Sequence, residues 1–483
     1  MNPYNVLAVD LGAESGRVIE ITFDGQRLAS REIHRFPNVP VRVHQTIYWD
    51  VLRLWQEILT GINQAGSPPN SISIDTWGVD FALLDRDSNL LANPVHYRDA
   101  RTDGLMEWVF ERIPRRAVFE KTGIQFMQLN TLYQLASLVK NHSQILEMAH
   151  SYLALPDLFN YWLCGAKQGE FTHATTTQLF NPRTCSWDRE LLDAVGIPAH
   201  IFPETVQPGE RLGDYNGIPV ITAAAHDTSS AVIAVPTTTE NFAYLSSGTW
   251  SLLGLELDHP VIDDEAYQAN VTNEGGAYGT FTFLKNLAGL WIVQQCRVTW
   301  QAEGQSYSYD QLTHEAAQAD PFRSYIDPDD PAFLPPGDMP ARVREICRRT
   351  GQPVPDTVGQ IVRAVFESLA LKYRFVLERL IALTGKPVDR LHIVGGGGRN
   401  ALLCQMAANA TGRQVIAGPF EATALGNGIV QLITLGALDN ITQAREILSR
   451  TQDTITYDPQ EVETWNEKYQ QYCSLLQDNQ ARH

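Results

Sequence analysis

The sequence lacks the features that define several common protein classes. Its six cysteines are scattered without a C-x-x-C pair, which argues against a disulfide framework or a zinc site and fits reduced thiols in the cytosol. No apolar run reaches the ~18 residues of a membrane-spanning helix. The first apolar run, residues 6–9, ends at Asp10, which indicates a core strand and no signal peptide. We therefore expect a cytoplasmic protein.

Positive charge is also scarce. The chain has 37 Lys and Arg residues against 55 Asp and Glu residues, a formal net charge of −18, which disfavours binding to nucleic acid or to an anionic membrane. The 12 histidines form no metal-ligand cluster, so any catalytic metal is expected to be a hard, oxygen-bound ion such as Mg²⁺ that arrives with a nucleotide. Neither a Walker G-x-x-x-x-G-K-[ST] loop nor an H-R-D kinase loop is present, which excludes those two phosphoryl-transfer designs.

The length and patterning of the chain predict two α/β domains. A chain of 483 residues is too long for one core, and 44% hydrophobic with 19% charged residues is an ordinary globular composition. Strand and helix patterns alternate, with helices expected over 51–64, 131–140, 152–163 and 358–383. The polar stretch 236–241 predicts a boundary that divides the chain into domains 1–238 and 239–483.

Two segments in different halves of the chain share one pattern. Residues 6–17 and 243–254 each contain an apolar strand, a turn of small residues and a second strand, which is typical of a β-hairpin. Small residues at such a tip leave backbone N–H groups free to bind phosphate oxygens. One such hairpin in each half predicts a nucleotide held between two related domains.

Asp10 stands at the end of the first strand, directly before the turn. A carboxylate in this place is well positioned to hold hydrated Mg²⁺ against the β- and γ-phosphates of a nucleotide, and Arg17 is close enough to reach the same phosphates. A helix cap or a solvated turn explains the pattern equally well.

The tripeptide His226-Asp227-Thr228 comes before an apolar helical pattern. Because Asp is among the preferred N-cap residues, the tripeptide alone favours a capping role for Asp227. The alternative is catalytic, since an aspartate that faces a ligand can accept a proton from an attacking hydroxyl.

Four consecutive glycines, Gly395–Gly398, separate a predicted strand from a predicted helix. The run departs from G-x-G-x-x-G because position 400 is Asn, so a dinucleotide-binding fold is not indicated. Glycines do allow an adenine or a ribose to approach the backbone closely. A tight strand-to-helix turn explains one or two of the four glycines more readily than all of them.

The segments 75–78 and 97–101 combine Trp, Tyr, Asp and Arg side chains. This mixture is typical of a polyol pocket, where an aromatic face covers C–H bonds and charged groups bind hydroxyls. A core tryptophan and a surface ion pair account for the spacing equally well.

Together these motifs resemble the FGGY family of carbohydrate kinases, and within it the members that phosphorylate L-rhamnulose. The matching segments run in order along most of the chain: residues 8–13, 15–18, 31–36, 74–81, 97–99, 130–135, 174–179, 226–228, 245–252, 272–276, 391–397 and 415–419. Glu14 departs from the family pattern, in which a small residue is expected, and the tail after Ser449 matches poorly.

The resemblance implies an α/β fold in which two actin-like ATPase domains, each ribonuclease-H-like, flank a deep catalytic cleft. It implies ATP and Mg²⁺ as co-substrate and cofactor, and phosphorylation of L-rhamnulose at its 1-hydroxyl in L-rhamnose catabolism. By motif, Asp227 is the general base and Asp10 holds the metal. The sugar site is expected to contain Trp77, Gly78, Arg98, His226, Asp227, Thr228 and Asn286. The nucleotide site is expected to contain Ala13, Glu14, Ser15, Gly16, Arg17, Thr249, Gln294, Gly396 and Gly397.

Two other functions stay open at this point. The same site could serve another ketose, such as L-fuculose or D-xylulose, because residues around Trp77 and Arg98 set the specificity. An actin-like ATPase could also be a nucleotide-driven switch without a small-molecule acceptor, although Asp227 and the pocket motifs count against this. Neither nucleic acid nor membrane is expected as a partner, and a monomer is compatible with the sequence.

Overall fold

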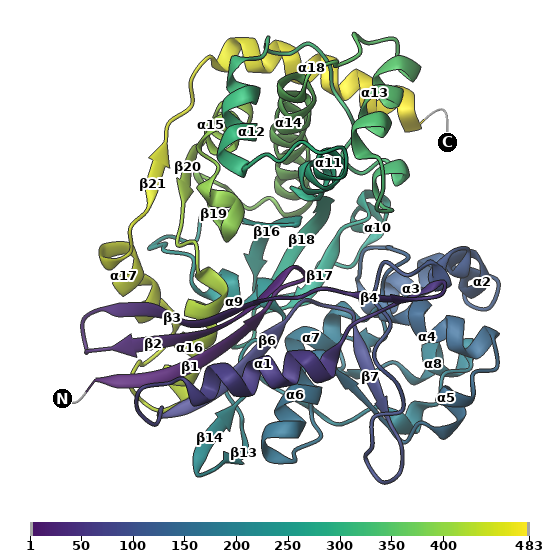
Figure 1. Ribbon diagram of the computed structural model, residues 1–483, viewed down its shortest axis with the longest axis vertical. Coiled ribbons are helices and arrows are strands. Elements are labelled where there is room, and N and C mark those ends of the chain that lie inside the picture. Colours follow the sequence, from purple (N-terminus) through teal and green to yellow (C-terminus); the bar gives the residue numbers. More distant parts are fainter. Residues whose placement is uncertain (1–2, 481–483) are drawn as a thin grey trace. The chain divides into compact units, whose positions relative to one another are not determined.

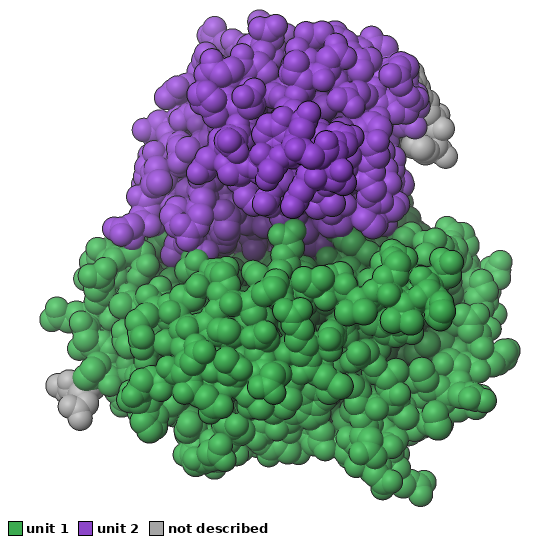
Figure 2. All heavy atoms as spheres, viewed as in Figure 1, with its two compact units in different colours: residues 1–238, 256–284, 421–452 green, residues 239–255, 285–420, 453–483 purple. Residues whose placement is uncertain are grey.

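The structure is a computed structural model that describes residues 3–480. The chain forms two compact units (Figure 2). Unit 1 comprises residues 1–238, 256–284 and 421–452, and unit 2 comprises residues 239–255, 285–420 and 453–483. Each unit is therefore assembled from segments that are far apart in the sequence.

The first sheet has six strands in the order β13-β14-β6-β1-β2-β3 (Figure 1). Along the sheet these strands are Arg211–Tyr215, Ile218–Ile221, Ser71–Thr76, Tyr4–Leu11, Ser15–Phe23 and Leu28–Pro37. The strands β1, β2 and β3 are joined antiparallel, whereas β6 lies parallel to β1 and β14 lies parallel to β6. The predicted first hairpin is thus confirmed as β1–β2.

Helices pack on both faces of this sheet. The helix α1 (Val51–Asn63) packs on β2 and β3, where Gly61 lies against Val18. The helix α16 (Ala422–Thr434) packs on β1 and β6, where Gly428 lies against Ile21. Because successive side chains of a strand alternate between faces, Val18 and Ile21 point to opposite sides, and so the two helices cover opposite faces.

The second sheet has seven strands in the order β17-β18-β16-β15-β19-β20-β21. Along the sheet these are Thr272–Gly275, Phe281–Ala288, Trp250–Leu257, Phe242–Ser247, Arg390–Val394, Gln414–Ala417 and Ile455–Tyr457. The strands β15 and β16 form the predicted second hairpin, and β19 and β20 continue the sheet in parallel. Both sheets therefore contain an antiparallel hairpin followed by two parallel strands.

The other elements complete the units. In unit 1 they are α2 (Leu105–Phe110), α3 (Arg115–Thr122), α4 (Thr131–Lys140), α5 (Gln144–Met148), α6 (Leu155–Cys164), α7 (Phe171–Thr176), α8 (Arg189–Val195), α9 (Asp227–Ile233), α10 (Asp264–Ala269) and α17 (Ile441–Thr451), with the short strands β4 (Val41–Val43), β5 (Thr46–Tyr48), β7 (Phe81–Leu84), β8 (Ser151–Ala154), β9 (Gly169–Glu170), β10 (Phe180–Asn181), β11 (Ser186–Trp187) and β12 (Thr205–Val206). In unit 2 the helices are α11 (Trp291–Ala302), α12 (Tyr309–Gln318), α13 (Met339–Arg349), α14 (Val358–Thr384), α15 (Ala401–Thr411) and α18 (Val462–Gln480). The helix α18 forms most of the tail after Ser449, and it packs on α14 and α15.

The expected helices 51–64, 131–140 and 358–383 are confirmed as α1, α4 and α14. The helix expected over 152–163 is wrong at its start. Residues 151–154 form β8, which pairs with β7, and the helix begins only at Leu155, with Pro156 in its first turn. Pairing with another strand overrode the local apolar spacing, while proline is readily accommodated at the first turn of a helix.

Two global expectations can be compared with the described chain. Over residues 3–480, no helix is long and apolar enough to cross a membrane. All six cysteines lie within these residues and are free thiols, three of them buried. The structure thus contains no disulfide in the part of the chain that it describes.

Candidate active site

In unit 1, the carboxyl ends of two parallel strands bring the predicted residues to one edge of the sheet. Asp10 of β1 is in register with Asp75 of β6. Just beyond, the Trp77 N–H donates to the Leu11 carbonyl at 3.1 Å, and the Thr76 N–H donates to the Ala225 carbonyl at 2.9 Å. The turn before Asp227 is therefore fixed beside the ends of both strands, which is where parallel sheets usually bind ligands.

Asp227 lies in the first turn of α9, but it does not cap this helix. The N-cap residue is His226, and its side chain makes no capping hydrogen bond. The Asp227 carboxylate accepts a hydrogen bond from the Thr228 hydroxyl at 3.3 Å, and its side chain keeps 30% of its surface exposed. Burial raises the pKa of Asp227, and the neighbouring His226 opposes this rise. The capping explanation thus does not hold.

The His226 ring lies between two carboxylates. Its Nε2 is 3.4 Å from Asp227 Oδ1, and its Nδ1 is 3.2 Å from Oε2 of Glu274 on β17. Gly78 lies against the same ring, because a Cβ added there would stand 3.3 Å from Nε2 and equally close to Thr176. A side chain at position 78 would crowd this space, so glycine keeps it clear.

Arg17 pairs with two carboxylates at the first hairpin. Its guanidinium forms ion pairs with Asp10, its register partner across the hairpin, and with Glu421, which precedes α16. Burial raises the pKa of Asp10, and Arg17 opposes that rise. The sequence analysis placed Asp10 and Arg17 together, whereas Glu421 was not identified.

Asp75 is a second buried carboxylate at this edge. Its Oδ2 accepts a hydrogen bond from Asn427 Nδ2 at 2.6 Å, while its Oδ1 is buried without a hydrogen-bond partner. Burial, followed by the charge of Asp10, raises the pKa of Asp75 well above its ordinary value. A nearby cation or a bound proton is what this arrangement requires.

The carboxylates of Asp10 and Asp75 fit the way in which proteins hold Mg²⁺. No group of three or more His, Cys, Asp and Glu side chains among residues 3–480 is arranged as a metal site. Nucleotide-bound Mg²⁺, however, usually takes only one or two protein carboxylates and completes its shell with water and phosphate. Asp10, with the partnerless Oδ1 of Asp75 close by, matches that smaller requirement.

Hydrogen bonds within the turn and from Asn38 hold the tip of the first hairpin in place. The Gly12 N–H donates to the Ser15 carbonyl at 3.0 Å. Asn38 braces the turn twice, since its N–H donates to the Glu14 carbonyl at 2.9 Å and its Nδ2 donates to the Gly12 carbonyl at 3.0 Å. The Glu14 side chain is exposed. The backbone of residues 12–16 is thus ordered, with its one acidic side chain at the surface.

Trp77 is largely a core residue. It is 5% exposed, its ring centroid is 4.3 Å from that of Trp49, and its Nε1 donates to Asp80 Oδ2 at 2.9 Å. The Trp49 Nε1 donates to the same oxygen at 2.5 Å. Burial raises the pKa of Asp80 to about 6. The polar atom of Trp77 is therefore occupied, and only ring carbon remains for a ligand.

Arg98 belongs to a neighbouring group of aromatic residues. Its N–H donates to His96 Nδ1 at 2.9 Å, and its guanidinium lies 5.3 Å from the ring centroid of Tyr97. The Trp49 ring stacks on His96 at 4.1 Å. The rings of His96, Tyr97 and Trp49 thus connect Arg98 with Trp77.

In unit 2, the second hairpin carries the start of a helix on its tip. The Leu290 and Trp291 N–H groups donate to the carbonyls of Gly248 and Thr249, each at 3.1 Å. The helix α11 begins there and places Gln294 in its first turn, with a buried amide oxygen that has no hydrogen-bond partner. Thr249 and Gln294 are thus brought together, and the half-buried Asn286 lies on the preceding strand β18.

The glycine run packs against the same hairpin. A Cβ at Gly397 would lie 2.0 Å from Ser247 Oγ, and Gly395 has a φ of +82°, which favours glycine. A Cβ at Gly398 would lie 3.2 Å from the Ile393 carbonyl oxygen, whereas Gly396 has nothing within 4 Å. Three of the glycines are therefore required by the turn itself, and only Gly396 faces open space.

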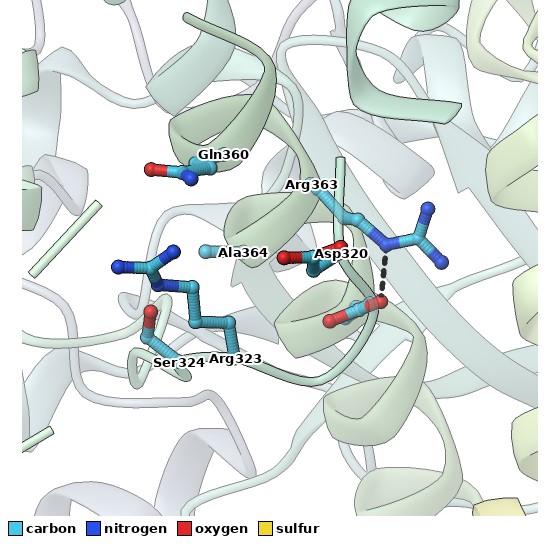
Figure 3. Close-up of a pocket in the computed structure, with 7 residues that line it drawn as sticks. Asp320, Arg323, Ser324, Gln360, Arg363 and Ala364 are labelled. Atoms are coloured by element: carbon cyan, nitrogen blue, oxygen red, sulfur yellow. Dashed lines mark hydrogen bonds and ion pairs between the residues drawn. The ribbon is translucent and has the colours of Figure 1, made fainter. Parts of the chain in front are cut away.

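A small polar pocket in unit 2 contains none of the predicted residues. It is lined by Asp320, Arg323, Ser324, Gln360, Arg363, Ala364 and Glu367 (Figure 3). Arg363 is already paired with Glu367 at 2.7 Å and donates to the Ala316 carbonyl at 3.1 Å. These charges are neutralised locally, so the pocket does not compete with the edge of the first sheet as the candidate site.

Comparison with known proteins assigns the chain to a family. Residues 5–234 match the N-terminal domain, and residues 243–435 the C-terminal domain, of the FGGY family of carbohydrate kinases. The chain belongs to this family. It is thus a carbohydrate kinase, a phosphotransferase that uses ATP as its substrate, as the sequence motifs predicted.

Individual relatives agree with this assignment. The chain is 48% identical to a rhamnulokinase of Bacteroides thetaiotaomicron over 96% of its own length and 98% of the relative's. It is 42% identical to a rhamnulokinase of an Enterobacter species, over 96% and 97% of the two chains. A solved xylulose kinase from Lactobacillus acidophilus superimposes with a TM-score of 0.80 at 17% identity, covering 98% and 97% of the chains. The predicted two-domain actin-like ATPase fold is thereby confirmed.

Several residues that hold the site were not predicted as part of it. Glu274, Glu421 and Asn427 contact predicted residues but lie far from them in the sequence. For Glu274 a signal existed, because it belongs to the quoted segment 272–276 and is a charged residue in a buried strand. The signal for Glu421 was weaker: it lies two residues after the quoted segment 415–419.

Proposed function

We propose that this protein transfers the γ-phosphoryl group of ATP to the 1-hydroxyl of L-rhamnulose, giving L-rhamnulose 1-phosphate and ADP. The observation that carries the reaction type is the Asp227 carboxylate, which takes no part in capping α9 and lies beside His226 at the open edge of the first sheet. The choice of sugar rests on the rhamnulokinases at 48% and 42% identity.

In this reaction Asp227 is the general base. As the sugar O1 forms its bond to the γ-phosphorus, the bond from that phosphorus to the β,γ-bridging oxygen breaks and ADP leaves. The O1 proton passes to Asp227. Because proton transfer can come late in phosphoryl transfer, a carboxylate serves without a strongly raised pKa. His226, Thr228 and Gly78 surround the base and contact the sugar.

The nucleotide is bound mainly through backbone groups. Residues 13–17 and Thr249 bind phosphate oxygens, while Gln294, Gly396 and Gly397 contact the nucleoside. The open space at Gly396 supports its part in this, whereas the contact of Gly397 with Ser247 supports an indirect one. Asp10 would hold Mg²⁺, which would supply positive charge to offset the charge that develops on the phosphates. Asn286, Trp77 and Arg98 complete the sugar site.

The same proposal covers the organisation of the chain. In it, residues 1–238 carry the sugar-binding part with the first phosphate hairpin, and residues 239–483 carry the second hairpin and the adenosine site, while residues 256–284 and 421–452 of the latter pack in unit 1. We place the protein in the cytoplasm, where ATP is available and its six free thiols stay reduced. A monomer is sufficient for the chemistry.

The first test is Mg²⁺-dependent ADP release by the purified protein with L-rhamnulose, L-fuculose, D-xylulose and glycerol. A clear preference for L-rhamnulose in kcat/KM supports the whole proposal. Activity with another ketose alone would keep the mechanism and refute the substrate. ATP hydrolysis that no sugar stimulates would point to the nucleotide switch, which no observation in the structure favours.

The second test is the Asp227→Asn variant. Asparagine keeps the shape but accepts no proton, so kcat should fall by about 10²- to 10⁴-fold while ATP binding changes little. Rapid-quench turnover together with fluorescence titration of ATP separates the two effects. Turnover close to that of the unmodified protein would refute the base assignment.

A further inference from the structure

The structure contains a fixed row of three side chains: Glu274, His226 and Asp227. The imidazole Nδ1 lies 3.2 Å from Glu274 Oε2, and its Nε2 lies 3.4 Å from Asp227 Oδ1. The Glu274 and His226 side chains are only 5% and 8% exposed, whereas Asp227 is 30% exposed. The row therefore runs from the interior of unit 1 to its accessible end at the base.

Glu274 is held rigidly by its strand. Residue 275, its neighbour on β17, donates its N–H to Thr175 Oγ1 at 2.7 Å and accepts a hydrogen bond from the Ser229 hydroxyl at 2.8 Å. The Glu274 carbonyl accepts from the Thr282 hydroxyl at 3.2 Å on the neighbouring strand β18. The backbone that carries the Glu274 carboxylate is thus held by hydrogen bonds with the neighbouring segments.

The turn that carries His226 is equally constrained. The His226 N–H donates to Thr172 Oγ1 at 3.1 Å, and the Ala225 N–H donates to Glu170 Oε2 at 3.1 Å. Glu170 Oε2 also accepts from the Thr172 hydroxyl at 2.6 Å. Both partners of the Glu274–His226 pair are therefore positioned by the fold, and their approach does not depend on a flexible loop.

A second buried histidine in the same region differs from His226 in the direction of its pKa shift. Burial lowers the pKa of His173, which lies on α7 near His226, to about 3. Burial acts on His226 in the same direction, but the carboxylates around the ring, Glu274 first among them, together raise the pKa of His226 above its ordinary value. Asp227 and Glu170 also face the ring and act in the same direction as Glu274. The carboxylates around the His226 ring thus favour its charged form.

We propose that Glu274 is a positioning residue of the sugar site, which fixes the His226 ring and keeps both of its nitrogens protonated, so that a permanent positive charge lies beside Asp227. This inference rests on the proposed function, because it takes Asp227 as the proton acceptor. The charge of Asp10 raises the pKa of Asp227 and that of His226 lowers it, so the charged ring favours the ionised form of the base. During transfer the sugar proton goes to Asp227, and His226 keeps its own.

The sign of the pH effect follows from these charges. The Glu274→Gln variant keeps the shape but removes the charge, so burial lowers the pKa of His226 and the ring becomes neutral near pH 7. Asp227 then keeps its burial and its anionic neighbours but loses the cation, so its pKa rises. Only ionised Asp227 accepts a proton. As the pH is lowered, the variant should therefore lose activity at a higher pH than the unmodified protein does.

The kinetic test is the pH profile of kcat/KM for the sugar. In Glu274→Gln the acid limb should move up by about 1 pH unit or more, with the KM for ATP changed less than about twofold. Glu256→Gln is a matched control, because Glu256 pairs with Arg445 elsewhere in unit 1 and its loss should leave the limb in place. An unmoved limb in Glu274→Gln would refute the proposal.

A double variant tests whether the effect passes through the ring. In a His226→Asn background, adding Glu274→Gln should shift the acid limb no further, since the charge that Glu274 controls is already missing. A full additional shift in that background would show that Glu274 acts on Asp227 directly, which would overturn the proposal.

Nitrogen-15 NMR of the unmodified protein decides the question without any variant of Glu274 and without activity. The His226 imidazole signals, assigned by their loss in His226→Asn, should show both nitrogens protonated at pH 7 and titration only above it. A ring that is neutral at pH 7 would refute the inference even if the sugar kinase activity is confirmed. Conversely, a protonated ring in a protein without sugar kinase activity would leave the pair intact and refute only the proposed function.

Discussion

The two hairpins share one backbone plan but differ in the side chains that surround their tips. At β1–β2, Arg17 is paired with Asp10 and Glu421, and Glu14 is exposed at the turn. At β15–β16 the tip is Ser247-Gly248-Thr249, which carries no charge. The tip of the first hairpin thus lies among charged side chains, whereas the tip residues of the second carry no charge.

The tip of the second hairpin is closely packed against neighbouring backbone. Gly397 approaches Ser247 so closely that a Cβ would stand 2.0 Å from its Oγ. A Cβ at Gly289 would stand 2.6 Å from the Trp250 backbone. The same motif therefore serves two tasks. In the first hairpin it positions charged side chains for the chemistry, and in the second it lets the backbone at Gly289 and Gly397 pack closely against the hairpin. Substitutions should separate the two tasks.

The largest difference should appear in catalysis. Asp10→Asn removes the carboxylate proposed to hold Mg²⁺, and kcat/KM should fall by about 10²- to 10³-fold. Thr249→Ala removes one hydroxyl from the uncharged tip, and kcat/KM should fall only about tenfold. Steady-state kinetics over a range of MgCl₂ concentrations measures both. Losses of equal size in the two variants would contradict the division of tasks.

A smaller difference should appear in stability. Gly397→Ala forces a methyl group against Ser247, and the free energy of unfolding should fall by about 1–3 kcal/mol. Gly396→Ala is the matched control one residue away, because nothing lies within 4 Å of its Cβ position. Urea denaturation followed by tryptophan fluorescence measures both variants. The control should be as stable as the unmodified protein, and any loss of ATP affinity in it would identify a nucleotide contact.

The smallest effect is expected from Glu14, where the sequence departs from the family pattern. The side chain is exposed at a turn proposed to bind phosphate, so Glu14→Ser removes a like charge that is screened by water. The KM for MgATP should fall by about two- to fivefold, and less at high ionic strength. A KM that rises would mean that Glu14 binds the nucleotide or its metal, in which case the first hairpin has one more charged ligand than we propose.

Much of the fold could be predicted from the sequence because its signals are local. Both hairpins, the helices α1, α4 and α14, and the strand β19 before the glycine run follow from apolar spacing and turn residues within short windows. Residues 152–154 show the limit, since their apolar spacing suits a helix and only the pairing of Tyr152 with Leu83 makes them a strand.

The site could be predicted only where its residues are neighbours in the chain. The role of Asp227 stayed open because capping and catalysis require the same residue type at the same position, and only the structure places His226 at the cap. The partners Glu421, Asn427 and Glu274 come from other segments, and no local pattern connects them with Arg17, Asp75 or His226. Long-range electrostatic partners are therefore the part that sequence reasoning missed.

The order of segments in unit 1 has a consequence for its synthesis. The helix α16 covers one face of the first sheet, supplies Asn427 to Asp75 and accepts a hydrogen bond from Ser71 through Gln431 at 2.6 Å. The ribosome completes β1 and β6 long before this helix exists. At ordinary elongation rates, about 10–40 s separate the end of the first segment at residue 238 from the end of the last at residue 452. During that interval one apolar face of the sheet and the Asp75 carboxylate are not yet covered by α16. The nascent chain should therefore bind chaperones, and a fragment ending near residue 238 should aggregate.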